Sequence, residues 1–195
     1  MKFDFSQIEV KTKRLIIRPL KSTDYESWFN AYTSRKPKMH KYDGNPVDPK
    51  GKTKSWFNKL VRKHEKNASD DKVYVFAVFD KRTNKHIGSL DFATIQRYNM
   101  NWANLGYAVN NNFQGKGYAK EFVKAAIHKI GFTKLKYKRI EAAINIDNKR
   151  SINLAKSIGM KKECIRPKFF FENGKWTDHV IYTVLSKNRK LEKLS

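Results

Sequence analysis

The sequence predicts an α/β fold built on one mixed β-sheet, and three observations carry that prediction. Between about residues 101 and 159, a strand, a helix, a second strand and a second helix follow one another, an order that places parallel strands side by side. Hairpin patterns on both sides of this stretch predict antiparallel strand pairs. No internal repeat, low-complexity segment or linker divides the chain. We therefore expect a single domain over residues 1–195.

The first half of the chain begins with a short strand and two helices. Residues 14–20 (RLIIRPL) form a β-rich run that Pro19 closes. A helix follows at about 22–32, where a polar residue caps the start and aromatic residues recur at helical spacing. Residues 34–51 hold three prolines and two glycines without periodicity, which predicts a long loop of the kind that often binds ligands. A second amphipathic helix spans about 56–67.

The second half alternates strands and helices and ends in a hairpin. Residues 72–80 are almost continuously apolar, which is typical of a strand buried on both faces. The helix that begins at Asn148 should end near Gly159, and Asn173 with Gly174 predicts the turn of the final hairpin. Further strands are expected at 86–96, 101–110, 138–146, 160–171 and 179–185, and a third helix from Tyr118 to about Gly131.

The charge balance is strongly basic: 42 Lys and Arg face 18 Asp and Glu, a net charge of +24. Such a chain attracts polyanions and anionic ligands at low salt. The basic residues are scattered rather than clustered, which favours a solvating surface. Because no nucleic-acid-binding motif is recognisable, we do not expect nucleic acid as the main partner.

Cysteine content and hydropathy further restrict the class of protein. Cys164 is the only cysteine, which excludes an internal disulfide and a thiolate metal cluster. The N-terminal residues lack the apolar segment of a secretory signal, and no apolar run reaches the length of a membrane span. We therefore expect a cytoplasmic protein with no membrane partner.

Residues 109–122 (VNNNFQGKGYAKEF) place a glycine-rich turn between a predicted strand and a predicted helix. Unpaired N–H groups at a helix start can hold an anion, and Gly115 and Gly117 permit positive φ and a close approach of pyrophosphate. A Walker loop is excluded because Gly117 stands where Ser or Thr is required. A dinucleotide fingerprint is disfavoured because Lys120 replaces its third glycine.

Two interpretations of the turn remain. One is a glycine-rich turn without a ligand. The other rests on the spacing of Gln114, Gly117 and Ala119, a Q-x-x-G-x-A pattern that resembles the coenzyme A pyrophosphate loop of the GNAT acyltransferases.

Other segments extend this resemblance to the RimJ/RimL-type N-acetyltransferases. RLIIRPL followed by Asp24 is similar to their opening strand and helix. LGYAVNNNFQGKGYAKE, which includes Glu121, is similar to their Gly-Tyr strand and loop, and NIDNKRSINLAKSIGMKKE to their Asn-x-x-Ser helix. Trp176, Asp178 and Tyr182 also fit. The resemblance covers about residues 12–186, the expected core, and leaves a short basic tail at 187–195. It implies a GNAT fold with about four helices and a centrally splayed, mixed sheet of about six to seven strands.

The resemblance implies acetyl-CoA as co-substrate and no metal. The pantetheine arm would pair with Tyr107 and Val109 where two strands splay apart, and the turn amides would hold the pyrophosphate. Ser151 would donate a hydrogen bond to the departing thiolate, and Asn148 would lie near the thioester or serve as the helix N-cap. The implied catalytic residues are Ser151 and Asn148, and the implied cofactor-binding residues are Tyr107, Val109, Gln114, Gly115, Lys116, Gly117, Tyr118, Ala119, Asn148 and Ser151.

The sequence departs from the family pattern at the positions where relatives carry the general base. Relatives often carry Glu before the Gly-Tyr pair, where this chain has Asn104. Others use Glu on the penultimate strand, and alignment on Gly159 and Glu163 puts Phe170 there. Neither side chain accepts a proton usefully. The remaining candidates are Asp91, which is weak, His40, Glu172 and a water held by backbone carbonyls.

A site without an obvious base favours an acceptor amine of low pKa. The reference pKa is ~7.7–8.0 for an α-amine and ~10.4 for Lys, a difference worth roughly 3.5 kcal/mol. We therefore expect acetyl transfer to the α-amine of a protein or peptide N-terminus. The net charge favours an acidic acceptor. The resemblance to the RimJ/RimL-type N-acetyltransferases favours a ribosome-associated acceptor. A small-molecule amine acetyltransferase and a catalytically idle acetyl-CoA-binding domain are the alternatives, and the protein is expected to be a monomer or homodimer.

Overall fold

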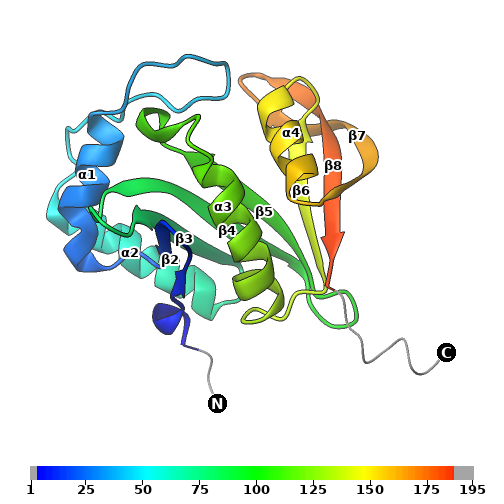
Figure 1. Ribbon diagram of the computed structural model, residues 1–195, viewed down its shortest axis with the longest axis horizontal. Helices are drawn as coiled ribbons and strands as arrows, with labels where there is room; N and C mark the ends of the chain where they lie inside the picture. The colour runs from blue at the N-terminus through cyan, green and yellow to red at the C-terminus, as the bar shows by residue number, and fades with distance from the viewer. Residues whose placement is uncertain (1–3, 187–195) are drawn as a thin grey trace.

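A computed structural model describes residues 4–186 of the chain (Figure 1). Its strands are β1 (Val10–Lys11), β2 (Leu15–Arg18), β3 (Val73–Asp80), β4 (His86–Gln96), β5 (Trp102–Val109), β6 (Arg139–Asn145), β7 (Lys161–Glu172) and β8 (Lys175–Leu185). Its α-helices are α1 (Tyr25–Thr33), α2 (Lys54–Ser69), α3 (Tyr118–Ala125) and α4 (Lys149–Ser157). Shorter helical segments are Phe5–Gln7, Ser22–Asp24 and Asn111–Phe113, which are 3₁₀ turns, and Ala126–Phe132, a π-helical continuation of α3.

The predicted elements are all present, and no helix or strand interrupts the predicted loop between Thr33 and Lys54. The predicted tail at residues 187–195 lies outside the described residues. The predicted hairpin turn is confirmed, because Asn173 and Gly174 have φ of +51° and +79°, the left-handed pair that a two-residue hairpin loop requires.

The strands form one sheet in the order β1-β2-β3-β4-β5-β6-β8-β7. Within residues 4–186, β5 and β6 are the one parallel pair, and the other neighbours are antiparallel. The predicted mixed α/β sheet is therefore confirmed. It has eight strands where about six to seven were predicted, because β1 has two residues and is too short to leave a pattern in the sequence.

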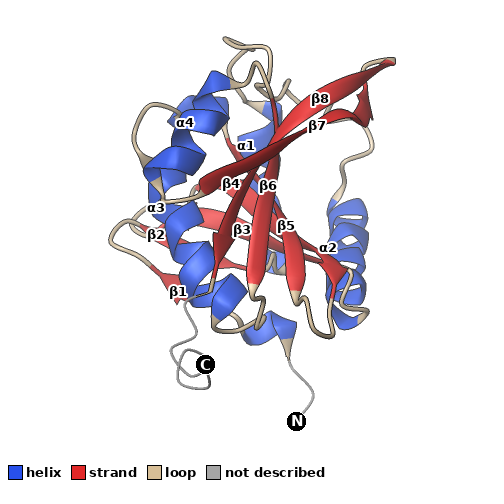
Figure 2. Cartoon of the chain, turned by 90° about the vertical axis from the view of Figure 1, so that its right-hand side faces the viewer, coloured by secondary structure: helices blue, strands red, loops and turns tan. Residues whose placement is uncertain are grey.

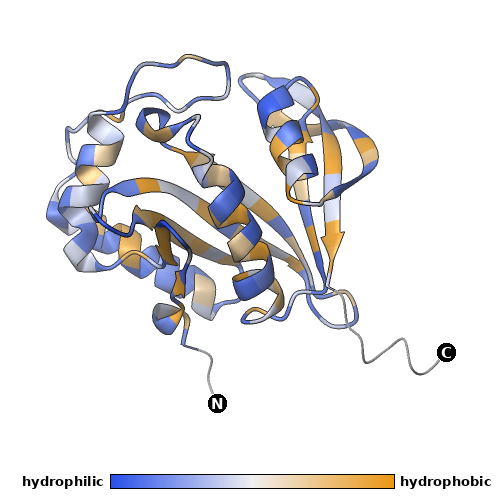
Figure 3. Cartoon of the chain, in the orientation of Figure 1, coloured by the Kyte–Doolittle hydropathy of each residue, from blue (hydrophilic) through white to orange (hydrophobic). Residues whose placement is uncertain are grey.

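Helices cover the two faces of the sheet with separate apolar clusters. Phe76 packs in a cluster with residues of α3 and α4, whereas its neighbour Ala77 packs in a cluster with α1 and α2, because successive side chains of a strand point to opposite faces. Figure 2 shows α3 and α4 on one side of the sheet and α2 on the other. Apolar colour gathers on the strands and polar colour on the helices in Figure 3.

The sheet opens between its two central strands. β5 and β6 pair at Trp102–Arg139, Ala103–Ile140 and Asn104–Glu141. Beyond Asn104 both strands continue, but they no longer pair with each other, and their ribbons diverge in Figure 1. The predicted central splay is confirmed, and it leaves an edge of β5 with unpaired backbone groups.

Within residues 4–186, none of the helices combines the length and the apolar character that crossing a bilayer requires.

Candidate active site

The glycine turn lies where the chain passes from β5 to α3. Gly115 and Gly117 have φ of +75° and +73°, left-handed conformations that glycine adopts without steric cost. A Cβ at Gly115 would meet no atom within 4 Å, and one at Gly117 would meet the Arg14 guanidinium at 3.7 Å. Backbone conformation rather than packing therefore requires glycine here, and the space above the turn is open.

The start of α3 leaves backbone donors available to an anion. Gly117 is the N-cap residue, and no side chain caps the helix. The first N–H groups of a helix have no partner within the helix, and the helix dipole adds positive potential at this end. The turn therefore fits a phosphate-bearing ligand such as coenzyme A.

Glu121 stabilises the glycine turn through Arg14, which contacts both. Its carboxylate accepts hydrogen bonds from the Thr12 hydroxyl at 2.6 Å and from Arg14 Nε at 2.7 Å. Arg14 also donates to the carbonyl oxygen of Lys116 at 2.9 Å. Burial raises the pKa of Glu121, but the hydrogen bonds and the charge of Arg14 outweigh burial and lower the pKa. Glu121 is thus a charged anchor for the turn.

A cavity of about 410 Å³, here called the turn cavity, extends from the glycine turn between β5 and α4. Of the residues predicted to bind the cofactor, it brings together Tyr107, Val109, Gln114, Ala119, Asn148 and Ser151. Residues 115–118 do not line it: Gly115, Lys116 and Gly117 are exposed on the adjoining turn, and Tyr118 is half-buried beneath Arg14.

The loop between α1 and α2, which the sequence predicts to be a binding segment, forms one wall of the turn cavity. Asp43, which is 6% exposed, accepts hydrogen bonds from Gln114 Nε2 at 2.9 Å and Arg150 Nη1 at 3.1 Å. Burial raises the pKa of Asp43, but the hydrogen bonds and the charge of Arg150 outweigh burial and hold the pKa below its usual value. Asp43 therefore ties the loop to both the glycine turn and α4.

Ser151 and Asn148 lie at the start of α4, as predicted. The Asn148 side chain accepts a hydrogen bond from the Ser151 N–H at 3.2 Å and so caps the helix. The Ser151 hydroxyl lies 2.6 Å from the Tyr107 hydroxyl on β5. Burial raises the pKa of Tyr107, and the hydrogen bond to Ser151 offsets part of that rise. Both hydroxyl groups are therefore protonated at neutral pH.

A second cavity of about 270 Å³, here called the Glu172 cavity, occupies the splay between β5 and β6. It shares Tyr107, Asn148 and Ser151 with the turn cavity. The two cavities therefore meet at the hydroxyl pair, and a group bound in one lies next to a group bound in the other.

Glu172 is the carboxylate of this second cavity. Its Oε2 accepts hydrogen bonds from Asn145 Nδ2 at 2.9 Å and Thr177 Oγ1 at 3.1 Å. The His179 ring, which is 2% exposed, has Nε2 3.9 Å from Glu172 Oε1. Phe170, which alignment placed at the base position, lines the same cavity two residues earlier on β7. Glu172 was a candidate from sequence, but its contact with β6 is too distant along the chain for any local pattern to indicate it.

The other base candidates lie elsewhere. Asp91 is half-buried on β4 opposite Gly106, and burial raises its pKa. It lines neither the turn cavity nor the Glu172 cavity, whereas His40 lines the turn cavity. Asn104 lines the Glu172 cavity, and its Oδ1 is buried without a hydrogen-bond partner among the described residues. This amide oxygen is a free acceptor where relatives were expected to carry a carboxylate.

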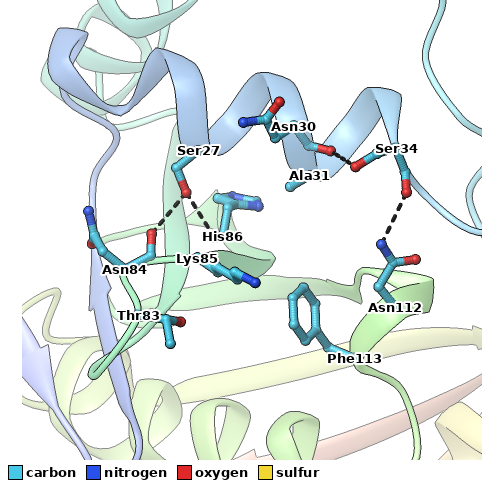
Figure 4. Close-up of a pocket in the computed structure, with 10 residues that line it drawn as sticks. All are labelled: Ser27, Asn30, Ala31, Ser34, Thr83, Asn84, Lys85, His86, Asn112 and Phe113. Carbon is cyan, nitrogen blue, oxygen red and sulfur yellow. Dashed lines mark hydrogen bonds between the residues drawn. The ribbon is translucent and has the colours of Figure 1, made fainter.

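A separate cavity of about 430 Å³ lies between α1, the turn joining β3 to β4, and residues 112–113 (Figure 4). Neutral amide and hydroxyl side chains dominate its lining, with Lys85 as its charged member. It shares no lining residue with the turn cavity or the Glu172 cavity. It therefore does not belong to the candidate active site. Among residues 4–186, no group of three or more His, Cys, Asp or Glu side chains is placed to hold a metal ion.

Comparisons with known proteins agree with this geometry. The profile of the family described as "Acetyltransferase (GNAT) domain" matches residues 14–161. The [Ribosomal protein uS5]-alanine N-acetyltransferase of Escherichia coli (strain K12) is 28% identical over 179 residues, which cover 90% of this chain and 89% of the relative.

Two solved structures share the fold. Mycobacterium smegmatis RimJ in complex with CoA-disulfide superposes with a TM-score of 0.77 at 16% identity, covering 96% of this chain and 91% of that chain. Spermidine N-acetyltransferase from Vibrio cholerae in complex with CoA and spermine has a TM-score of 0.66 at 21% identity, covering 89% and 96%.

These findings define the class of the protein as an acetyl-transferring enzyme. The chain belongs to the GNAT acetyltransferase family, whose members use acetyl-CoA, and is similar in sequence to a ribosomal-protein N-acetyltransferase. The resemblance to N-acetyltransferases inferred from the sequence motifs is confirmed.

Proposed function

We propose that the protein transfers the acetyl group of acetyl-CoA to the α-amine of a protein or peptide N-terminus. The observation that carries this proposal is the meeting of two cavities at Tyr107, Asn148 and Ser151. One cavity begins at an anion-binding turn, and the other contains a carboxylate. Direct transfer between two bound substrates requires this adjacency, because it depends on holding the reacting groups together.

The turn cavity is assigned to acetyl-CoA. The open glycine turn and the uncapped start of α3 would hold the pyrophosphate, with the Lys116 side chain as an added positive charge. The free edge of β5 beyond Asn104, near Tyr107 and Val109, would pair with the amides of the pantetheine arm as another strand would. When bound, acetyl-CoA supplies the activated thioester.

Groups of the chain would stabilise the negative charge that develops during the reaction and accept the proton that the amine loses. The amine nitrogen forms a bond to the thioester carbonyl carbon while the carbon–sulfur bond breaks, and backbone N–H groups near Val109 would stabilise negative charge on the oxygen. Glu172 would take the proton that the amine loses, directly or through a water. Ser151 would donate a hydrogen bond to the departing sulfur, supported by Tyr107. Asn145 and Thr177 hold Glu172 in place.

Two physical arguments favour an α-amine as the acceptor. An α-amine has a reference pKa of ~7.7–8.0 and is partly neutral at physiological pH, whereas Lys at ~10.4 is not. The net charge of +24 repels polycations at long range, which disfavours a spermidine-like acceptor. The similarity to a ribosomal-protein N-acetyltransferase supports a protein acceptor, and the charge favours an acidic or ribosome-associated one.

An acceptor panel tests the proposal. Peptides with free N-termini, peptides whose α-amine is blocked but which carry Lys, and spermidine are each incubated with acetyl-CoA, and free coenzyme A thiol is measured. We expect the highest kcat/KM for free N-termini. Preference for Lys side chains or spermidine would overturn the assignment, and no turnover with any amine would favour an idle acetyl-CoA-binding domain.

Salt dependence tests the acidic acceptor separately. The kcat/KM for an acidic N-terminal peptide should fall steeply from low to high salt because ions screen attraction between separated charges. The kcat/KM for an uncharged peptide of equal length should change little. Equal salt responses of the two peptides would argue against electrostatic selection.

A further inference from the structure

His179 is a buried imidazole to which the proposed function gives no role. It lies on β8, is 2% exposed and lines the Glu172 cavity together with Glu172 itself. Among the described residues, His179 is the one basic side chain within 4.0 Å of the Glu172 carboxylate, and its Nε2 lies 3.9 Å from Oε1. The general base of the proposed reaction therefore lies beside an imidazole ring.

The hydrogen bond of the His179 ring indicates which nitrogen carries the proton. Nδ1 lies 3.2 Å from the carbonyl oxygen of Thr177. A carbonyl oxygen only accepts hydrogen bonds, so Nδ1 is the donor, and the other nitrogen of the neutral ring is a bare acceptor. Among residues 4–186, no hydrogen bond occupies Nε2. In the neutral ring, the nitrogen nearest Glu172 is thus free to take up a proton.

The two oxygen atoms of the Glu172 carboxylate have different surroundings. Oε2 accepts hydrogen bonds from Asn145 and Thr177. Oε1 accepts none within the described part of the chain and lies next to His179 Nε2. Hydrogen bonds to a carboxylate oxygen favour its charged form. A proton taken up by Glu172 therefore binds Oε1, the oxygen beside the imidazole.

Aromatic rings hold the imidazole in this orientation. The Phe170 ring packs edge-to-face on the His179 ring, with ring centroids 4.8 Å apart, and the Phe169 ring lies 6.1 Å away. Edge-to-face contact is a favoured geometry for packed rings. The distance of 3.9 Å between Nε2 and Glu172 Oε1 exceeds a hydrogen bond. Catalytic hydrogen bonds are often long in a free enzyme, and they shorten or pass through one water in the reacting complex.

The neighbouring strands place no competing charge on the His179 ring. Arg166 is the register partner of His179 on β7, and its guanidinium donates to Glu141 at 3.0 Å. Asn145 is the register partner of His179 on β6, and its amide is neutral. The ring therefore has Glu172 as its ionic neighbour.

Two further charged side chains lie close by along the hairpin. Lys175 is the register partner of Glu172, but the two form no ion pair within 4.0 Å. Asp178 precedes His179, but successive side chains of a strand point to opposite faces, and its carboxylate accepts a hydrogen bond from the Lys168 N–H at 2.8 Å. The exchange of a proton can therefore be assigned to the Glu172–His179 pair.

We propose that His179 relays the proton that Glu172 takes from the acceptor amine. As the amine nitrogen bonds to the thioester carbonyl carbon, one N–H proton moves to Glu172 Oε1, and the carboxylate becomes a carboxylic acid. The Oε1–H proton then passes to His179 Nε2, which restores the carboxylate and leaves an imidazolium ring. The ring later loses this proton to solvent water. His179 acts through Glu172 and is thus a positioning residue, and the inference rests on the proposed function.

The relay provides a stronger final proton acceptor than a carboxylate alone. The reference pKa is ~6.5 for a histidine side chain and ~4.3 for a glutamate side chain, a difference of about 2 pH units. A general base is most effective when its pKa lies near the working pH. With about half of the difference expressed in the transition state, the relay contributes about tenfold in rate.

The kinetic experiment compares the wild type with His179→Gln from about pH 5.5 to 8.5, using an N-terminal peptide as acceptor. Protonation of the peptide amine affects both proteins equally and cancels from the ratio of their kcat/KM values. The ratio should be about tenfold at pH 8 and approach one below about pH 6, because imidazoles take up a proton in this range and the relay is then already occupied. A ratio that is constant with pH indicates a purely structural role and overturns the inference.

Two further variants serve as controls. His64→Gln makes the same change in an imidazole of α2 that lies outside the Glu172 cavity, and it should keep the wild-type kcat/KM at every pH. In the Glu172→Gln background, His179→Gln should cause no further loss, because the relay has no function without the carboxylate that loads it. A second loss of about tenfold in the double variant would show that His179 acts independently of Glu172, and it overturns the relay.

A spectroscopic experiment tests the relay without turnover and without a substitution. Nitrogen NMR spectra of the wild-type protein at about pH 8 should show a neutral His179 ring with its proton on Nδ1. A proton on Nε2 would leave no acceptor for the proton of Glu172. That result overturns the inference, whatever amine the protein acetylates.

The experiments distinguish failure of the relay from failure of the proposed function. Acetylation of N-terminal peptides with a constant kcat/KM ratio, or with a proton on Nε2, leaves the proposed function standing and rejects the relay. Absence of acetylation of any amine contradicts the proposed function and, with it, the relay. If spermidine or a Lys side chain is the better acceptor, the same ratio measured with that amine decides on the relay.

Discussion

The hydroxyl groups of Tyr107 and Ser151 lie 2.6 Å apart and join β5 to α4 at the point where β5 and β6 separate. Both residues line the turn cavity and the Glu172 cavity. Because burial raises the pKa of Tyr107, its phenol remains a donor throughout the physiological range. Tyr107 can thus donate to Ser151 and leave the serine proton free for the thioester sulfur that the proposed function places between the cavities.

Removal of the serine hydroxyl should slow transfer without weakening cofactor binding. A hydrogen bond to a charged group is worth about 1.5–3 kcal/mol, so Ser151→Ala should reduce the single-turnover rate about 10- to 150-fold. The Kd for acetyl-CoA should change by less than about threefold. Tyr107→Phe should have a smaller effect, and the double variant should be no slower than Ser151→Ala because the two hydroxyls act as a unit. A wild-type rate in Ser151→Ala would contradict the role given to this hydroxyl.

Removal of the Glu172 carboxylate should slow transfer most at neutral pH. General base catalysis contributes about 10²–10⁴ in rate, so Glu172→Gln should lower kcat/KM for an N-terminal peptide within that range at pH 7. Raising the pH to about 9 should recover part of the rate, because an α-amine with a pKa near ~8 loses its proton unaided.

Glu163→Gln is the matched control for Glu172→Gln. Glu163 lies on the same strand, β7, but pairs with Arg139 at 2.6 Å, outside the Glu172 cavity. It should retain wild-type kcat/KM and pH dependence. Equal losses in both variants would show that β7 acts through stability rather than through Glu172.

A methyl group on the glycine turn should weaken binding of acetyl-CoA selectively. Gly117 has φ of +73°, a conformation that costs a residue with a Cβ roughly 1–2 kcal/mol. Gly117→Ala should therefore raise the KM for acetyl-CoA by about tenfold with little change in kcat. Gly51→Ala is the control, since Gly51 has φ of +74° and open space around its Cα but lies outside the turn cavity. An equal KM increase in both variants would point to lost stability instead.

Acidification should destabilise the fold through His86. Burial lowers the pKa of His86 from the ordinary value of 6.5 to about 4, with the charges of Arg35 and Arg18 opposing that of Asp24. Between these pH values the unfolded chain binds a proton that the folded chain excludes, so stability falls as pH falls from about 6.5 to about 4. The loss from this group is about 3 kcal/mol.

Urea unfolding across this pH range measures the effect. His86→Gln should show a shallower loss of unfolding free energy on acidification than the wild type, whatever its stability at pH 7. His40→Gln, a change on the exposed loop, should follow the wild type. Parallel pH profiles for the wild type and His86→Gln would exclude His86 as the source.

The glycine turn and the hairpin turn could be predicted from the sequence because their causes are local. Positive φ at Gly115, Gly117 and Gly174 follows from residues within a few positions along the chain. The same holds for Asn148, whose capping bond reaches Ser151 three residues later. The motif order then identified the family, and with it the central splay.

Tertiary structure determines which residues contact one another in the candidate active site. Alignment placed Phe170 at the expected base position, whereas the fold brings Glu172 to the β6 residue Asn145 at 2.9 Å. The register of β7 with β8 shifts between Arg166 and Phe170, and an irregularity of this kind re-aims the side chains that follow it.

The contact between Asp43 and Arg150 could not be predicted from local sequence patterns either, because it joins a loop without periodicity to a helix residue 107 positions away. Local propensity and spacing therefore determined the elements, the glycine turn and the fold class. Which side chains meet across the splay, and which cavity each one lines, depended on long-range packing that no single segment encodes.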